Sequence, residues 1–227
     1  MIKKGDYIME LGGMSGWLYR ISEVISRMAY VNILWILFTI LGLGLFGFMP
    51  ATVALFAVIR KWIMGEKEIP IFSTFWNNYR KEFIKSNLLG AILLIIGYIL
   101  YIDLTFVPTG GFFTALRIGL LVITLFFVII LLYIFPLYAH FEWKIRLYLK
   151  NSLLLGLSHP HYTLMMIVGI VALYYICLKF PGIIPFFSIS ILAYILMWPA
   201  YLVIKKIEDL QASDEEENVE NASVQNK

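Results

Sequence analysis

The chain has 227 residues, of which 61% are hydrophobic and 16% aromatic, while only 15% carry a charge. This composition excludes an ordinary soluble domain, in which about a quarter of the residues are charged, and it predicts an all-α polytopic membrane protein. Residues 1–207 hold 17 basic and 8 acidic side chains, a net charge of +9, whereas residues 208–227 have a net charge of −6. A basic membrane domain suits anionic lipid headgroups, so we expect membrane lipids as partners and no nucleic acid.

The stretch 30–62, YVNILWILFTILGLGLFGFMPATVALFAVIRKW, has no charge before Arg60 and is too long for one comfortable crossing. Glycines at 42, 44 and 47 loosen a helix and Pro50 cannot continue one, so we predict a helical hairpin. Pro50 favours the first position of a new helix, which gives a short segment over residues 51–64 of about 21 Å. A helix start inside the bilayer would leave amides for a ligand, which makes Gly47 and Pro50 candidate binding residues. A tight, water-wetted turn at the outer interface is the alternative.

Apolar runs over 88–106, 115–138, 162–178 and 186–204 bring the predicted membrane segments to about six. Two amphipathic cytoplasmic helices are expected before the third and fifth segments, at 71–86 and within residues 140–162. Aromatic and basic residues separate onto opposite faces of the first, which favours either the headgroup region or a docking surface for a partner. The candidate binding residues near it are Arg60, Trp62, Trp76 and Arg80.

Asp103 and Arg117 lie on either side of one predicted turn between two spans. Ionic groups at membrane depth are often functional, so both are candidate binding residues, although pairing with each other or with headgroups is the simpler interpretation.

Basic residues gather in residues 3–27, 60–85, 144–150 and 205–206. The positive-inside rule makes all four regions of a multi-pass membrane protein cytoplasmic, together with both termini. Residues 208–227 are acidic and poor in apolar residues, which predicts a disordered tail after a single membrane domain at 1–207.

Known catalytic signatures are missing from the sequence. It has no glycine-rich phosphate loop, no zinc-protease motif and no serine elbow. His159 and His161 have no nearby cysteine or acid pair, which makes them a poor metal site. The sequence therefore predicts a protein that is not an enzyme and needs no metal or cofactor.

The segment FGFMPATVALFAVIRKW, with AYVNILWILFTILGLG before it and EIPIFSTFWNNYRKEFIKSNLLG after it, resembles the YesL-like family of bacterial membrane proteins. Members of that family have no defined molecular function, and their genes commonly lie beside carbohydrate uptake and glycan-degradation systems. The resemblance implies an accessory or regulatory role in oligosaccharide uptake, with an ABC sugar importer or its ATPase as partner. A permease-type subunit of such an importer is the first alternative, although the Glu-Ala-Ala loop of those permeases is absent. A structural or assembly factor is the second.

Overall fold

A computed structural model describes residues 14–66, 68–108 and 110–225. Within these ranges the protein is all-α and has no β-strand, which confirms the predicted fold class. The elements are α2 (Met14–Leu41), α3 (Leu45–Ile63), α4 (Ile71–Phe106), α5 (Phe112–His140), α6 (Ile145–Ser158), α7 (Pro160–Lys179), the 3-10 turn η1 (Pro181–Ile183) and α8 (Ile184–Gln225). In the described part, six helices are long and apolar enough to cross a membrane, and α6 is not among them.

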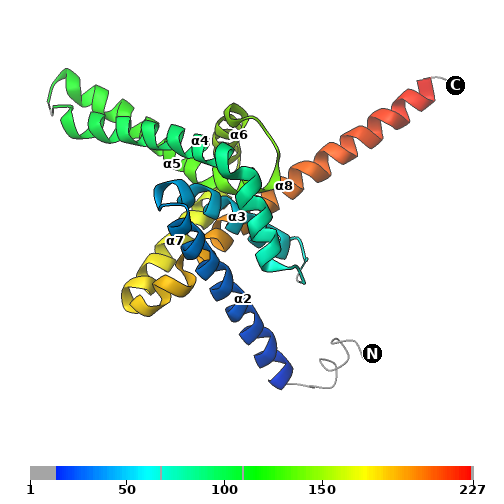
Figure 1. Cartoon of the computed structure of the whole chain (residues 1–227). Helices are drawn as coiled ribbons and strands as arrows, with labels where there is room; N and C mark the ends of the chain where they lie inside the picture. The colour runs from blue at the N-terminus through cyan, green and yellow to red at the C-terminus, as the bar shows by residue number, and fades with distance from the viewer. Residues whose placement is uncertain (1–13, 67, 109, 226–227) are drawn as a thin grey trace, which may run out of the picture.

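Helix α3 lies at the centre of the bundle and packs against α2, α4, α5 and α8 (Figure 1). Every residue from Pro50 to Ile59 is buried. The helix is apolar on all sides, as expected for one surrounded by protein, and the small side chains of Ala51, Ala54 and Ala57 let neighbouring helices approach closely. The hairpin predicted for residues 30–62 therefore forms the core around which the other spans are arranged.

The break in that hairpin lies earlier than predicted. Helix α2 ends at Leu41 and α3 begins at Leu45, with Leu43 and Gly44 between them at φ 60° and 73°, the left-handed region that reverses the chain. Pro50 is therefore inside α3 rather than at its start. Helix α3 has 19 residues, about 28 Å at 1.5 Å per residue, so the prediction of a short second segment over 51–64 was wrong.

A proline is tolerated at position 50 because a distant side chain replaces the missing N–H. In an unbroken helix the N–H of residue 50 would donate to the carbonyl of Phe46, and proline has none. The Nδ2 of Asn87, on α4, donates to that carbonyl at 2.9 Å. The freed backbone group is thus satisfied by a side chain of a neighbouring helix, as a position in a membrane requires.

The predicted amphipathic helix at 71–86 is not a separate element. It is the first part of α4, which continues for 36 residues. Its aromatic face contacts α2: Phe75 and Tyr79 are buried, with ring centroids 5.3 and 5.0 Å from that of Phe38. The Tyr79 hydroxyl also donates to the Phe38 carbonyl at 3.1 Å, so this face holds the end of the first span in place.

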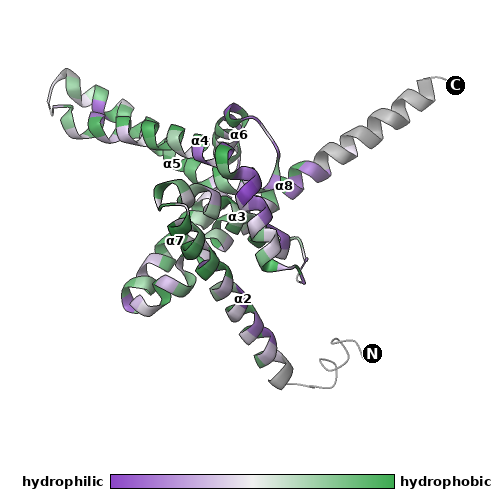
Figure 2. Cartoon of the chain, in the orientation of Figure 1, coloured by the Kyte–Doolittle hydropathy of each residue, from purple (hydrophilic) through white to green (hydrophobic). Residues whose placement is uncertain are grey.

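Helix α8 also continues through the segment that the sequence predicted to be a disordered tail. It runs for 42 residues to Gln225 and projects out of the bundle (Figure 1). No glycine or proline occurs after Pro199, and residues 208–227 include five glutamates, which favour helix. Hydrophobic residues dominate the α4–α5 arm, and hydrophilic ones gather where α8 leaves the bundle (Figure 2).

Candidate functional site

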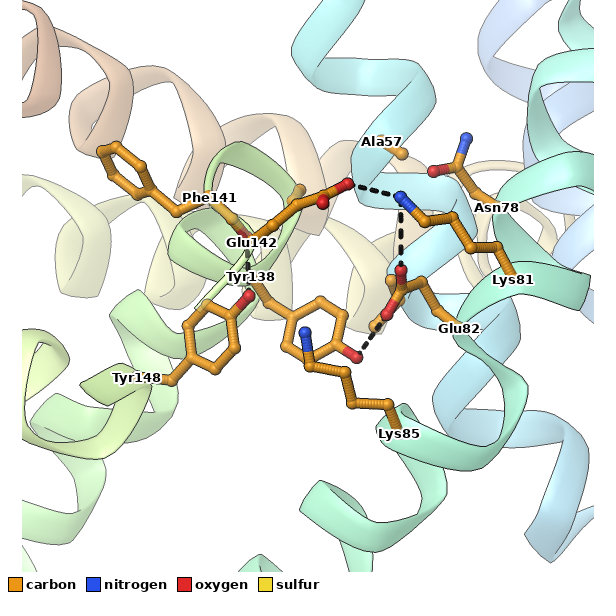
Figure 3. A pocket seen from close by; sticks show the side chains of 11 residues that line it. Ala57, Asn78, Lys81, Glu82, Lys85, Tyr138, Phe141, Glu142 and Tyr148 are labelled. Atoms are coloured by element: carbon orange, nitrogen blue, oxygen red, sulfur yellow. Dashed lines mark hydrogen bonds and ion pairs between the residues drawn. The ribbon is translucent and has the colours of Figure 1, made fainter. Parts of the chain in front are cut away.

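Four charged side chains meet where the first part of α4 faces the linker between α5 and α6 (Figure 3). We call Lys81, Glu82, Lys85 and Glu142, together with Tyr138 and Tyr148, the ionic cluster. The Lys81 ammonium forms an ion pair with the Glu142 carboxylate of the linker and lies 3.9 Å from Glu82 Oε1. The cluster thus joins two parts of the chain 61 residues apart.

The aromatic half of the cluster surrounds the second lysine. The Tyr138 and Tyr148 rings stack with centroids 4.8 Å apart, and Lys85 Nζ lies 5.2 and 5.4 Å from them. Both distances are within the range of a cation–π interaction. The Tyr138 hydroxyl donates to Glu82 Oε2 at 2.7 Å, so every member of the cluster has a partner.

Hydrogen bonds to the linker backbone fix Tyr148. Its hydroxyl donates to the Phe141 carbonyl at 2.6 Å and accepts from the Trp143 N–H at 2.9 Å. Burial raises the pKa of the Tyr148 phenol, so it keeps its proton in the physiological range. The hydrogen bond and charge of Lys81 lower the pKa of Glu142, which stays ionised.

A cavity of about 50 Å³ lies among these side chains, with Asn78 and Ala57 also in its lining. That volume holds a few water molecules and is far below the roughly 300–1,000 Å³ typical of small-molecule pockets. The ionic cluster is therefore a junction that holds α4 against the α5–α6 linker, and it has no room for a sugar ring.

Gly47 and Pro50, predicted as candidates at the hairpin break, are both buried in α3. A Cβ on Gly47 would lie 2.5 Å from the Thr39 carbonyl oxygen and 2.6 Å from that of Phe38. Gly47 thus permits the close approach of α2 and α3, a packing role visible in the structure, while a binding role for either residue stays a prediction.

Arg60 takes part in a chain of hydrogen bonds that sequence reasoning missed. Its Nε donates to His140 Nδ1 at 3.2 Å, and His140 Nε2 lies 3.1 Å from Glu208 Oε1. Because Nδ1 accepts, the proton of a neutral imidazole is on Nε2, from which it is donated to the carboxylate. Helices α3, α5 and α8 are therefore linked through one imidazole, and the first residue of the predicted tail makes a packing contact.

The remaining predicted candidates do not converge on one site. The Arg80 guanidinium lies 5.4 Å above the ring of Trp76, whereas Trp62 lines a separate cavity beside α2. Asp103 and Arg117 are half-buried on α4 and α5, and within the described residues no ion pair joins them.

Asn32 is the buried polar residue that the sequence interpretation overlooked. It is only 1% exposed, and its side-chain amide forms hydrogen bonds with the backbone at the start of α8. Its Nδ2 donates to the Pro185 carbonyl at 2.7 Å, while its Oδ1 accepts from the N–H groups of Ile189 and Ser190 at 3.1 and 3.0 Å. A lone asparagine in the run YVNILW was the available signal, since polar residues at membrane depth need partners.

Potential metal ligands do not cluster in the described ranges: no group of three or more histidine, cysteine, aspartate or glutamate side chains is arranged to hold an ion. His159 and His161 lie at the junction of α6 and α7 in an edge-to-face arrangement, with ring centroids 6.1 Å apart.

A central apolar helix, six candidate spans and buried polar groups bonded from helix to helix define a polytopic α-helical membrane protein. Residues 28–104 match the family described as "Protein of unknown function, DUF624". The chain is 49% identical over 201 residues to the uncharacterized protein YteU of Bacillus subtilis (strain 168), covering 88% of this chain and 90% of YteU.

Two further relatives come from the same organism. The uncharacterized protein YesV is 38% identical over 193 residues, covering 84% of this chain and 93% of YesV. The uncharacterized protein YesL is 35% identical over 191 residues, covering 84% of this chain and 90% of YesL. The chain belongs to the DUF624 family, in its YesL-like group. No solved structure matches it.

Proposed function

We propose that the protein is a non-enzymatic accessory or regulatory component of oligosaccharide uptake in the bacterial plasma membrane. The part of the proposal that concerns sugar uptake rests on the resemblance to the YesL-like family. The observation that carries the accessory role is the bonding of the buried polar groups. The buried Asn32 and the buried pair Tyr133–Thr163 each bond one helix to another, as does the half-buried Asn87. These bonds favour a role in holding the bundle together over a role in lining a pathway.

The ionic cluster supplies the surface through which such a component would act. Lys81 and Glu142 are exposed, with side chains 60% and 81% accessible, and they lie at the end of the bundle that the positive-inside rule makes cytoplasmic. A partner with its own charged groups would compete for this ion pair, which makes the junction between α4 and the α5–α6 linker the contact site of the proposed complex.

A permease-type subunit is the second candidate. Helix α6 is a separate 14-residue helix between two candidate spans, and Arg146 and Lys150 are exposed on it. A short cytoplasmic helix of this kind is what a permease offers to an ATPase.

Co-purification of the full-length tagged protein separates the two candidates. Association with an already complete sugar importer supports the accessory role, and a stable stoichiometric complex with an ATPase alone supports the permease. The Lys81→Glu variant should weaken the association, and the swap Lys81→Glu with Glu142→Lys should not restore it, because the swap re-forms the internal ion pair but reverses the charges that the partner meets. Recovery of the protein without any transport component, together with normal glycan uptake in a deletion strain, would contradict both.

The proposed orientation is testable with single cysteines in a Cys177→Ala background. Glu66→Cys and Ser158→Cys should be shielded from a membrane-impermeant thiol reagent in intact cells, while Thr114→Cys should react. Glu66 and Thr114 are preferable to the neighbouring Gly65 and Gly110, whose φ angles of 94° and 122° disfavour any side chain. Labelling of Glu66→Cys from outside would contradict the orientation.

A further inference from the structure

A cavity of about 590 Å³ lies beside the first half of α2, well away from the ionic cluster. We call it the α2 cavity. The end of α3, the α3–α4 linker and α8 complete its walls. Its lining combines apolar and aromatic side chains with charged ones: Val24, Met28, Trp62, Tyr194, Arg20, Glu23, Arg27 and Glu68. The volume falls within the roughly 300–1,000 Å³ usual for small-molecule sites.

The charges that line the α2 cavity are not all neutralised by one another. Glu23 and Arg27 form an ion pair at 2.5 Å along α2. Arg20 and Glu68, by contrast, have no ion-pair partner within the ranges that the structure describes. The cavity thus presents one uncompensated cation and one uncompensated anion, so a ligand that carries both charges would complement it.

Trp62 adds an aromatic ring to this lining. Its indole Nε1 is buried and has no acceptor among the described residues. Because that nitrogen is closed to solvent, a ligand in the cavity contacts other atoms of the ring. The ring thus lies in the wall of the same cavity as the two uncompensated charges.

The position of the cavity matches the depth of lipid headgroups. The candidate span of α2 begins at Trp17, and that of α3 ends at Ile63, so Arg20 and Trp62 both lie near span ends. Tryptophan and tyrosine are enriched at that depth, where an aromatic ring meets both apolar chains and polar headgroups. Val24 and Met28 follow Arg20 toward the interior of the span, which gives an acyl chain an apolar surface to lie along.

We propose that the α2 cavity binds a zwitterionic aminophospholipid. The lipid phosphate pairs with Arg20, its primary ammonium pairs with Glu68, and the upper part of one acyl chain packs on Val24 and Met28. A lipid without an amine leaves Glu68 without a partner, and a choline headgroup has no N–H to donate to the carboxylate. This proposal is independent of the role in sugar uptake.

Native mass spectrometry of the full-length protein in mild detergent tests the proposal. After delipidation, dioleoyl phosphatidylethanolamine, phosphatidylglycerol and phosphatidylcholine are added in equal amounts. One phosphatidylethanolamine should be retained, at least tenfold more than either other lipid. Arg20→Gln and Glu68→Gln should each lower its retention about tenfold, while Arg117→Gln, on the far arm of α5, should leave it unchanged.

Two additions keep the test decisive. Val24→Trp, which fills the cavity from its wall, should also abolish retention, with gel filtration and melting temperature confirming that each variant is folded. The soluble headgroup glycerophosphoethanolamine should not displace the lipid, because it lacks acyl chains. Equal retention of all three lipids, preferred retention of phosphatidylglycerol that Glu68→Gln does not change, or closure of the cavity by a second copy in a lipid-free dimer would overturn the proposal.

Discussion

Replacing Asn87 by leucine should destabilise the bundle because it removes the donor that compensates for Pro50. The Asn87 amide donates to the Phe46 carbonyl at 2.9 Å and to the Phe83 carbonyl at 2.8 Å. The Phe83 carbonyl keeps its helical donor, the backbone N–H of residue 87, whereas the Phe46 carbonyl loses the Asn87 bond and Pro50 cannot replace it. Interhelical hydrogen bonds in membranes average about 0.6 and reach about 1.7 kcal/mol, so we expect a loss of about 1.5 kcal/mol, near the upper end.

A double-mutant cycle isolates this compensation. Pro50→Ala restores a backbone N–H four residues after Phe46, so in that background Asn87→Leu should cost only about 0.5 kcal/mol, a coupling of about 1 kcal/mol. The free energy of unfolding is measured by denaturing-detergent titration in mixed micelles, followed by circular dichroism. Asn77→Leu, an exposed asparagine of the same helix, is the matched control. An equal cost of Asn87→Leu with proline and with alanine at position 50 would refute the reasoning.

Three further predictions follow from contacts described above. Gly47→Ala should lower the free energy of unfolding by several kcal/mol and reduce the amount of protein in the membrane. Gly119→Ala, in open space on α5, should leave the amount unchanged and should leave the free energy of unfolding unchanged or raise it by up to about 1 kcal/mol. Equal behaviour of the two variants would contradict the close packing. A chain ending at residue 207 should have a melting temperature a few degrees below that of a chain ending at residue 212. The shorter chain loses the hydrogen bond between His140 and Glu208, which is worth at most about 1 kcal/mol for a half-exposed pair. Identical melting temperatures would show that this bond contributes nothing. The lowered pKa of Glu142 means that its ion pair stabilises the fold above the ordinary carboxyl pKa of about 4.3 and is lost as the pH falls through the lowered value. The melting-temperature difference between wild type and Glu142→Gln should therefore be constant above about pH 5 and vanish in stronger acid; a difference that persists there would count against the pair.

The sequence predicted the spans well because long apolar runs separated by basic loops depend on local composition alone. Local helix propensity placed the hairpin break at Pro50, whereas the chain reverses at Leu43 and Gly44. A proline that would start a helix in isolation is tolerated inside one when Asn87, 41 residues from the carbonyl it serves, supplies a donor. The aromatic face of α4 was assigned to the headgroup region because amphipathicity does not tell lipid from a neighbouring helix.

The candidate site was less predictable than the fold. Trp76 and Arg80 were assigned to opposite faces of the helix, yet the Arg80 guanidinium lies 5.4 Å above the Trp76 ring, because residues one helical turn apart are neighbours. The partners of Arg60 and Lys81 come from residues 80 and 61 positions away, and no pattern in a single sequence specifies such pairs. Glu142 was read only as part of an amphipathic segment, although it provides the contact that joins that segment to α4.

The amide of Asn32 also sets an order for biogenesis. It belongs to the first of the six candidate spans of the described chain, yet its three hydrogen-bond partners lie between Pro185 and Ser190, in the sixth. Until α8 has been inserted, the first span carries an unsatisfied polar group in the bilayer, which is unfavourable and leaves its association with the bundle incomplete. The final helix thus completes the site that the first one leaves open, so a chain truncated before residue 185 should be recognised by membrane quality control as an unfinished protein.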